Sequence, residues 1–217
     1  MRLLLISSSP HKEKSQTLLL AKELLKGFPS FVKTEIMHLC DYKIEFCRHC
    51  ESCHRKIMHC PINDDVHTIL ERILEAEGII FASPNYINQI TASMKALWDR
   101  AAHFIHCRRL LGKYVAGVVS SGSGQDKAVL EYIQHYANIC GAQYAGGISS
   151  RRPIDNKKAE EALNLGNKLV LYIQEKRVFP EQVKVIEEFK EYFKNVIQMR
   201  KDDWVEEYQY WLDRGWL

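Results

Sequence analysis

The sequence lacks the features that mark several large classes of protein. Its 30 lysines and arginines against 27 aspartates and glutamates leave a net charge of only +3, which is too small and too dispersed to indicate nucleic-acid binding. It contains no internal repeat, no low-complexity tract and no apolar run long enough to cross a bilayer. We therefore expect no nucleic-acid partner and no insertion into a membrane.

The composition also excludes disordered and fibrous chains. Hydrophobic residues make up 46% of the chain and charged residues 26%, which is the balance of a protein with a packed core. A chain of 217 residues is long enough for one generous domain.

No N-terminal segment resembles a secretory signal, and the seven cysteines are an odd number. Both features argue against a disulfide framework, so we expect a cytoplasmic protein. Cys40, Cys107 and Cys140 lie at the ends of expected elements and are interpreted as ordinary buried cysteines. The other four cysteines fall within fourteen residues and require a chemical explanation.

Apolar runs and helical periods alternate along the chain. Strands are expected at residues 2–7, 31–39, 78–83, 114–120 and 144–148, and helices from residue 15 or 16 to Gly27 and over 64–76, 91–107, 126–140 and 156–176. Five strand–helix units in succession predict an α/β fold with a five-stranded parallel sheet that helices cover on both faces. This is a three-layer α/β/α sandwich over residues 1–176.

The remaining residues, 177–217, form a C-terminal extension. A break at Pro180 is followed by an amphipathic pattern that ends near Arg200. The tail beyond it contains Trp204, Tyr208, Tyr210, Trp211 and Trp216, an apolar load that water would disfavour. We expect this tail to pack on its own domain or on a second subunit, and we expect a homodimer or homotetramer.

Polar loops follow the first, third and fourth expected strands. In a parallel sheet these loops meet at the carboxyl edge, where ligands bind. The first loop is rich in hydroxyls and leads into a helix N-terminus, which favours a phosphate; alternatively, Ser15 merely caps the helix. The loops at 83–89 and 120–125 offer an aromatic ring, amides and small residues that are suited to a flat heteroaromatic ring, although each alone could be a simple turn.

These segments together resemble a known family. Residues 8–11 (Ser-Ser-Pro-His) with 15–17 (Ser-Gln-Thr) are similar to the G-S-P-R…S-N-T phosphate loop of flavodoxin-like, NADPH-dependent FMN reductases, with Ser8 in place of Gly and His11 in place of Arg. Residues 83–86 (Ser-Pro-Asn-Tyr) and 94–100 (Met-Lys-Ala-Leu-Trp-Asp-Arg) resemble the S-P-x-Y…L-K-x-x-x-D-R segment of that family. The cysteine motif resembles the subgroup called iron-sulfur flavoproteins.

The resemblance implies bound FMN, strand order 2-1-3-4-5 and a set of cofactor-binding residues. The phosphate would be held by Ser9, His11, Ser15, Gln16 and Thr17; the ring would be bordered by Pro84, Asn85, Tyr86, Ile87 and Asn88 and closed by Ser121, Gly122, Ser123 and Gly124. The chemistry is that of the flavin, so no catalytic side chain is expected, although Asn85 and Tyr86 would lie near the ring.

The cysteine motif reads C-x2-C-x2-C-x6-C in a loop at residues 40–62, with Cys47, Cys50, Cys53 and Cys60 as candidate ligands. Three thiolates at two-residue gaps and a fourth returning after six residues suit a [4Fe-4S] cluster. Zinc is an alternative, because the interleaved His49, His54 and His59 offer further ligands, and free thiols are another.

The charged and histidine side chains around the motif have simpler interpretations. The three histidines are expected on a solvated loop, and Asp64 and Asp65 are expected to start the next helix. Lys95, Asp99 and Arg100 are expected to form structural or interface ion pairs. In the flavodoxin strand order the cysteine loop shares an edge with the flavin.

The sequence therefore predicts an FMN-dependent oxidoreductase of the iron-sulfur flavoprotein type. It would pass electrons from NAD(P)H or a ferredoxin-like donor to a quinone, a small electrophile or an oxygen species. One alternative is an NAD(P)H-dependent FMN or quinone reductase with no cluster. A non-enzymatic electron carrier and a zinc-stapled interaction module are the others.

Overall fold

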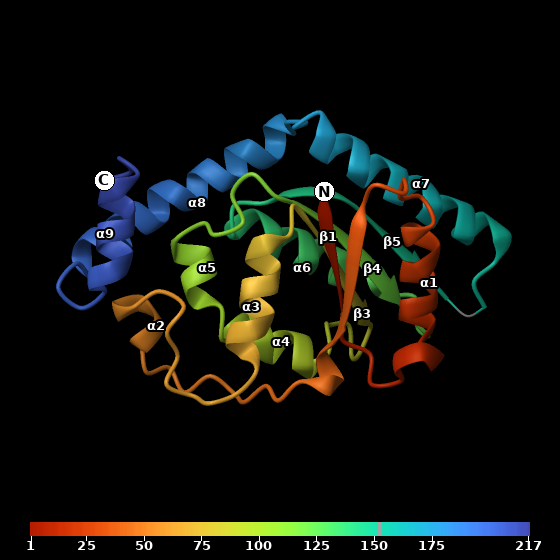
Figure 1. Ribbon diagram of the computed structural model, residues 1–217, viewed down its shortest axis with the longest axis horizontal. Helices are drawn as coiled ribbons and strands as arrows, with labels where there is room; N and C mark the ends of the chain where they lie inside the picture. Colours follow the sequence, from red (N-terminus) through yellow and green to blue (C-terminus); the bar gives the residue numbers. More distant parts are fainter. Residues whose placement is uncertain (152) are drawn as a thin grey trace.

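The computed structural model describes residues 1–151 and 153–217. Its centre is a parallel sheet of five strands in the order β2-β1-β3-β4-β5 (Figure 1). The strands are β1 (Arg2–Ser7), β2 (Lys33–His38), β3 (Gly78–Pro84), β4 (Tyr114–Ser120) and β5 (Gln143–Ser150). The predicted fold class and strand order are confirmed, with β2 shorter and β5 longer than the sequence indicated.

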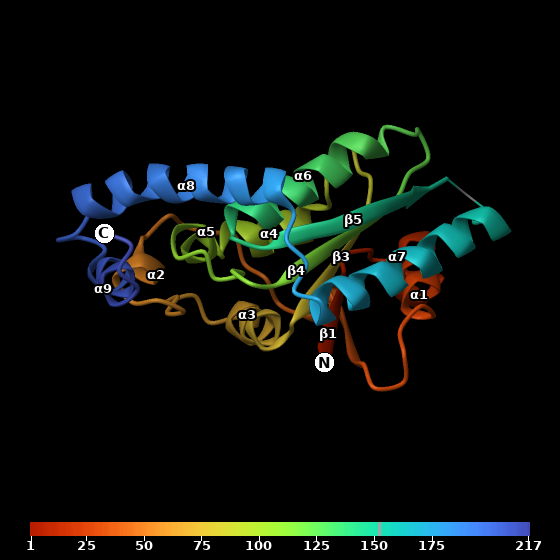
Figure 2. The same cartoon turned by 90° about the horizontal axis from the view of Figure 1, so that it is seen from above.

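Helices cover both faces of this sheet and extend beyond it (Figure 2). They are α1 (Gln16–Leu25), α2 (Ser52–Arg55), α3 (Val66–Glu75), α4 (Ala92–Asp99), α5 (Ala102–His106), α6 (Asp126–Ile139), α7 (Asn156–Gln174), α8 (Pro180–Met199) and α9 (Val205–Asp213). Short 3-10 turns, η1 (Lys12–Lys14) and η2 (Leu39–Asp41), follow β1 and β2. None of these helices is both long and apolar enough to cross a membrane.

The alternation of side chains along the strands divides the core into two layers. Leu3 and Leu5 of β1 pack with α1 and α7, whereas Leu4 and Ile6 pack with α3, α4 and α6 on the other face. Each of these side chains is at most 2% exposed. A strand buried on both faces requires a continuous apolar run, which is the pattern that identified β1 in the sequence.

The helices α1 and α7 approach each other so closely that glycine is required at their contact. A Cβ atom on Gly166 would lie 2.0 Å from the carbonyl oxygen of Leu24, and one on Gly27 would lie 2.2 Å from that of Leu163. Gly27 therefore has a packing role in addition to ending α1.

The single helix expected over residues 91–107 is wrong, because the structure has two helices, α4 and α5, with a break at Arg100 and Ala101. Ala101 adopts a non-helical backbone with φ −108° and ψ 30°. The side chain of Arg100 is buried against Asp64. This tertiary contact outweighs the local helical preference of the segment.

The C-terminal extension packs on its own chain. Helix α8 runs along α6, and α9 lies against α2 at the far end of the molecule from α1 and α7 (Figures 1 and 2). Ile197, Trp204 and Trp211 form a separate buried cluster within it. Within this chain the tail thus lies on the cysteine-rich segment, which contains α2.

Candidate flavin and cysteine sites

The loop after β1 crosses the carboxyl edge of the sheet and leads into α1. Ser8 and Ser9 are 2% exposed, and the Ser8 hydroxyl donates to the carbonyl of Ala82 at 3.3 Å. Ser15 caps α1, because its Oγ accepts from the backbone N–H of Leu18 at 3.3 Å. The capping role expected for Ser15 is thus present, and it leaves the positive end of the α1 dipole facing this edge.

The ends of α1 and β4 are joined at the same place. The hydroxyls of Thr17 and Ser120 lie 2.6 Å apart, and the backbone N–H of Asn85 donates to the carbonyl of Ser120 at 2.8 Å. The structure thereby brings together the loops after β1, β3 and β4, as the sequence predicted from their order in the chain.

A groove of about 440 Å³ opens between the β3 and β4 loops. It is lined by Pro84, Asn85, Tyr86, Ser120, Ser121, Gly122 and Arg151. The Asn85 amide donates to Ser121 Oγ at 3.2 Å, and the same oxygen accepts from the backbone N–H of Gly124 at 2.9 Å. These bonds fix the two walls of the groove relative to each other.

Two predicted ring-bordering residues lie on a turn outside this groove. Ile87 and Asn88 have left-handed φ angles of 53° and 59°, and the backbones of Tyr86 and Gln89 bond to each other on either side of them. Ile87 is 97% exposed. A β-branched residue is disfavoured in this conformation, so the turn stores strain at the rim of the groove.

Arg151 is a groove residue that the sequence reasoning missed. It follows β5, and only the loops after the first, third and fourth strands were considered. Its guanidinium lies against Gly124, where a Cβ atom would be 1.8 Å from Arg151 Nη2. The order of strands, with β5 beside β4, is the signal that places this residue at the groove.

The four clustered cysteines surround a second cavity. Its lining contains Cys47, Cys50, Cys53 and Cys60 together with residues from α4 and α5. The loop reaches this position through left-handed backbone at His49, Glu51 and Met58. The structure thus brings all four cysteines to the lining of one cavity.

Both ends of the cysteine loop are held by a buried ion pair. Arg100 and Asp64 have side chains that are each 1% exposed, with Nη1 and Oδ2 2.7 Å apart. Asp64 accepts from the backbone N–H of Glu45 at 2.8 Å, and Arg100 donates to the carbonyl of Glu45 at 2.8 Å and to Cys60 Sγ at 3.2 Å. Asp64 therefore does more than start α3, which was its predicted role.

The expected ion pairs of the α4 segment are only partly as predicted. Lys95 pairs with Asp99 on the exposed surface of α4, which agrees with a structural role. Arg100 pairs with Asp64 instead. A contact between residues 36 positions apart in the chain cannot be inferred from local spacing.

A carboxylate of the C-terminal extension forms the other anchor of the loop. Glu207 on α9 is fully buried, and its two oxygens accept from His54 Nδ1 at 2.8 Å and from His106 Nδ1 at 3.0 Å. The ring of Trp204 packs on both imidazoles, with centroid distances of 4.5 and 4.9 Å. The expectation of a solvated His54 is wrong, because the helix α9 covers it.

The charges of this anchor reinforce one another. Burial opposes the charge on His54, but hydrogen bonds to Cys53 and Glu207 outweigh it and raise the pKa of His54 to about 10. Burial also opposes the charge on Glu207, yet the hydrogen bonds from His106 and His54 hold its pKa below the ordinary 4.5. The contact is therefore an ion pair at neutral pH.

Further contacts join the extension to the loop. Glu51 pairs with Arg200 and accepts from Trp204 Nε1 at 3.2 Å, and the backbone N–H of Ile57 donates to Glu206. The extension thus holds the segment that contains Cys50 and Cys53 at several points.

The remaining cysteines divide between surface and core. Cys107 and Cys140 are fully buried, as predicted, and burial raises the pKa of each thiol. Cys40 is exposed, so its predicted burial is wrong. It lies in η2, where its Sγ is 3.9 Å from the carbonyl of Ser9, because the chain there turns outward from β2 at the sheet edge.

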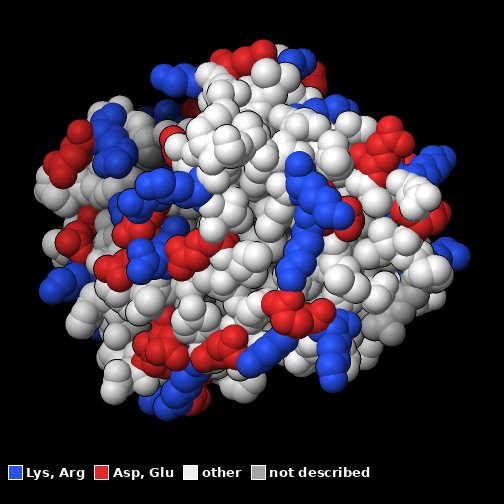
Figure 3. Space-filling model, turned by 45° about the vertical axis from the view of Figure 1, so that its right-hand side comes forward, with Lys and Arg blue, Asp and Glu red and all other residues white. Residues whose placement is uncertain are grey.

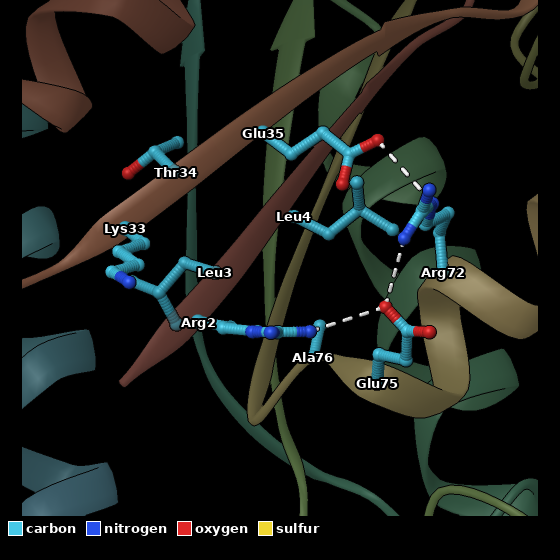
Figure 4. Close-up of a pocket in the computed structure, with 9 residues that line it drawn as sticks. All are labelled: Arg2, Leu3, Leu4, Lys33, Thr34, Glu35, Arg72, Glu75 and Ala76. Carbon is cyan, nitrogen blue, oxygen red and sulfur yellow. Dashed lines mark hydrogen bonds and ion pairs between the residues drawn. The ribbon is translucent and has the colours of Figure 1, made fainter.

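A separate hollow of about 280 Å³ lies beside the amino-terminal ends of β1 and β2 (Figure 4). Within it, Arg72 pairs with Glu35 and Glu75, and Arg2 pairs with Glu75. These pairs are exposed and contribute little to stability. Lysine and arginine are likewise interspersed with aspartate and glutamate on the face in Figure 3, in line with the small net charge.

His103 makes the stability of the protein depend on pH. It is 1% exposed, with Nε2 3.2 Å from Met58 Sδ. Burial lowers its pKa to about 3; Glu207 favours its charge, whereas Arg109 and the nearby histidines oppose it.

The unfolded state binds this proton near the ordinary pKa of 6.5, so the contribution of His103 is complete above pH 6.5 and is lost as the pH falls towards 3. At pH 5 the loss is about 2 kcal/mol. Urea unfolding at pH 7 and pH 5 should show a smaller pH effect in His103→Leu than in the wild type. The exposed control His67→Gln should retain the full effect; equal pH effects in all three proteins would contradict the assignment.

Comparison with known proteins decides the family. The model of the NADPH-dependent FMN reductase family matches residues 1–152. The chain belongs to this family. An iron-sulfur flavoprotein of Methanocaldococcus jannaschii is 32% identical over 185 residues, which cover 78% of this chain and 95% of the relative. An iron-sulfur flavoprotein of Archaeoglobus fulgidus is 27% identical over 220 residues and covers 98% of both chains.

A solved structure of an NADH:FMN oxidoreductase in its apo form has the same fold. Its TM-score is 0.60 at 17% identity, with 78% of this chain and 88% of that chain covered. The predicted membership of the FMN reductase family, among the iron-sulfur flavoproteins, is confirmed. The chain is therefore an FMN-dependent oxidoreductase.

The groove and the α1 terminus fit the cofactor of the FMN reductase family. A Cβ atom on Gly122 would meet nothing within 4 Å, so this wall is open to a planar ring. Asn85 Oδ1, beside the groove, is buried and accepts no hydrogen bond from the described residues. The groove volume of about 440 Å³ lies in the range of small-ligand sites.

The donor set of the cysteine cavity suits a thiolate-bound metal site, because four cysteines line one cavity beside a buried guanidinium. Within residues 1–151 and 153–217, His54, His106 and Glu207 form a separate group whose ligand atoms all lie within 4.8 Å of one another.

Proposed function

We propose that this oxidoreductase binds FMN in the groove between the β3 and β4 loops, with the phosphate at the N-terminus of α1. The segment with Ser9, His11, Ser15, Gln16 and Thr17 would hold the phosphate. Pro84, Asn85 and Tyr86 with residues 121–124 would border the ring, and Ile87 and Asn88 would lie on the turn outside the groove. Bound FMN supplies hydride and single-electron chemistry. The contribution of the chain is to position the ring and to set its electrostatic surroundings.

We propose further that Cys47, Cys50, Cys53 and Cys60 hold a [4Fe-4S] cluster. The observation that carries this proposal is the cavity that all four thiols line, closed by the buried guanidinium of Arg100. A positive group beside the thiols stabilises the negative charge of a thiolate-bound cluster. The C-x2-C-x2-C-x6-C spacing in the sequence favours a cluster over zinc, which more often uses two separate C-x2-C pairs.

Helix α4 connects the β3 loop, which borders the proposed flavin groove, to Arg100 beside the cysteine cavity. Thr91 caps the start of this helix after the β3 loop, and Arg100 follows its last residue. Eight residues at 1.5 Å each separate these ends by about 12 Å. We propose that electrons from NAD(P)H or a ferredoxin-like donor reach a quinone, a small electrophile or an oxygen species through these two centres, in a cytoplasmic homo-oligomer.

Anaerobic purification followed by absorption spectroscopy and metal analysis tests this function. Flavin bands on a broad iron–thiolate absorption, with iron and acid-labile sulfide in about equal amounts, are expected. Flavin without iron would refute the cluster and support the alternative of a reductase that has no cluster. Stoichiometric zinc without flavin would refute both proposals. Oxidation of NAD(P)H coupled to quinone reduction then separates an enzyme from an electron carrier.

A further inference from the structure

We propose that Arg100 is a positioning residue that holds Cys60 and, through an N–H···S hydrogen bond, raises the reduction potential of the cluster. The inference rests on the proposed function, because it requires that the four cysteines bind a cluster. It goes beyond that function by assigning to one side chain outside the cysteine motif the control of the cluster's potential.

The geometry of the guanidinium is fully specified by its partners. Nη1 donates to Asp64 Oδ2 at 2.7 Å and to the carbonyl of Glu45 at 2.8 Å. Nη2 donates to Asp64 Oδ1 at 3.1 Å and to Cys60 Sγ at 3.2 Å. The bidentate pairing with Asp64 fixes the plane of the group, so the second N–H of Nη2 is aimed at the sulfur.

Cys60 has the buried guanidinium of Arg100 as hydrogen-bond donor, whereas the buried cation beside Cys53, His54, is paired with Glu207. Cys47 accepts from the backbone N–H of His49 at 3.4 Å, and Cys50 bonds to the hydroxyl of Ser52 at 3.4 Å. These two cysteines are exposed, whereas Arg100 is 4% exposed. Because burial reduces screening by water, the guanidinium acts on Cys60 more strongly than the His49 N–H and the Ser52 hydroxyl act on Cys47 and Cys50.

The electrostatic consequence follows from the charge of the two redox states. A reduced cluster is more negative than an oxidised one, so a donor to a ligand sulfur stabilises the reduced state more. A charge-assisted hydrogen bond is stronger than a neutral one, and only the difference in its strength between the two redox states changes the potential.

The test is the midpoint potential of the cluster in Arg100→Lys, measured by redox titration with electron paramagnetic resonance. Lysine keeps a positive charge that can pair with Asp64, but it lacks the planar guanidinium whose second nitrogen also donates to Cys60. We expect the ratio of reduced to oxidised cluster at fixed potential to fall about tenfold, which is a shift of about 59 mV to lower potential for one electron.

The matched control is Arg108→Lys. Arg108 is also 4% exposed and bonds to Glu187 at 2.7 Å, but it does not line the cysteine cavity. Its replacement should leave the potential unchanged. An unchanged potential in Arg100→Lys, with cluster present, would overturn the role of Arg100 and leave the proposed function standing. Absence of iron and sulfide from the wild-type protein would overturn both.

A measurement on the wild-type protein keeps the inference testable if Arg100→Lys does not load a cluster. Labelling arginine with ¹⁵N should produce a nitrogen hyperfine coupling in pulsed resonance spectra of the reduced cluster. The same coupling should persist in labelled Arg108→Lys. A reduced cluster with no such coupling would show that Arg100 makes no hydrogen bond to it.

Discussion

Replacing Cys50 with alanine will remove the iron and acid-labile sulfide from the protein and leave its flavin bound. Cys50 lies between the other two closely spaced cysteines and lines the shared cavity. Loss of one of four thiolates opens a corner of the cluster to solvent, because Cys50 is itself at the surface. Iron and sulfide should fall from about four of each per chain to near zero.

The flavin should remain because none of the residues that line its groove lines the cysteine cavity. Absorption spectra and iron and sulfide assays on anaerobically prepared protein provide the measurement. Cys40→Ala is the matched control, since Cys40 is exposed but lies at η2 outside the cavity, and it should keep full iron. A Cys50→Ala protein with wild-type iron and broad absorption would refute the cluster assignment.

Replacing Glu207 with alanine will lower the free energy of unfolding by about 3–5 kcal/mol, the usual result of removing one partner from a buried ion pair. His54 and His106 would each lose the oxygen to which they donate. The cysteine loop should then open more often, so limited proteolysis between residues 47 and 60 and release of iron should both become faster.

Two further variants show whether the ion pair is the cause. Glu207→Gln keeps one oxygen acceptor and should lie between alanine and the wild type in urea unfolding. Glu188→Ala removes an exposed glutamate of α8 and should have almost no effect. If Glu207→Ala and Glu188→Ala unfolded at the same urea concentration, α9 would not be an anchor of the loop.

The role of the C-terminal extension illustrates what local patterns can and cannot predict. The aromatic residues of the tail indicated that it must be covered, because so much apolar surface is unfavourable in water. The partner surface depends on Glu51, His54 and Ile57, which are about 150 positions away in the chain. No spacing rule connects residues at that separation.

The same distinction applies to Arg100. Its position in a helical pattern predicted one continuous helix, and its neighbours Lys95 and Asp99 suggested a local ion-pair set. The structure breaks the helix there and buries the guanidinium against Asp64. Burying both members of an ion pair is costly unless hydrogen bonds compensate, and the partners of the two terminal nitrogens of Arg100 lie 36 to 55 positions earlier in the chain.

The sequence by itself determined the α/β class, the five strands, the polar loops at the carboxyl edge and the close spacing of four cysteines in one loop. These features follow from short-range periodicity and spacing, which can be recognised from residues that are close together in the sequence. Only the tertiary structure decided that Arg151 lines the groove, that Arg100 contacts Cys60 and that α9 covers the cysteine loop. Such contacts form where distant segments exclude water together, and their energy depends on the burial that the complete fold creates.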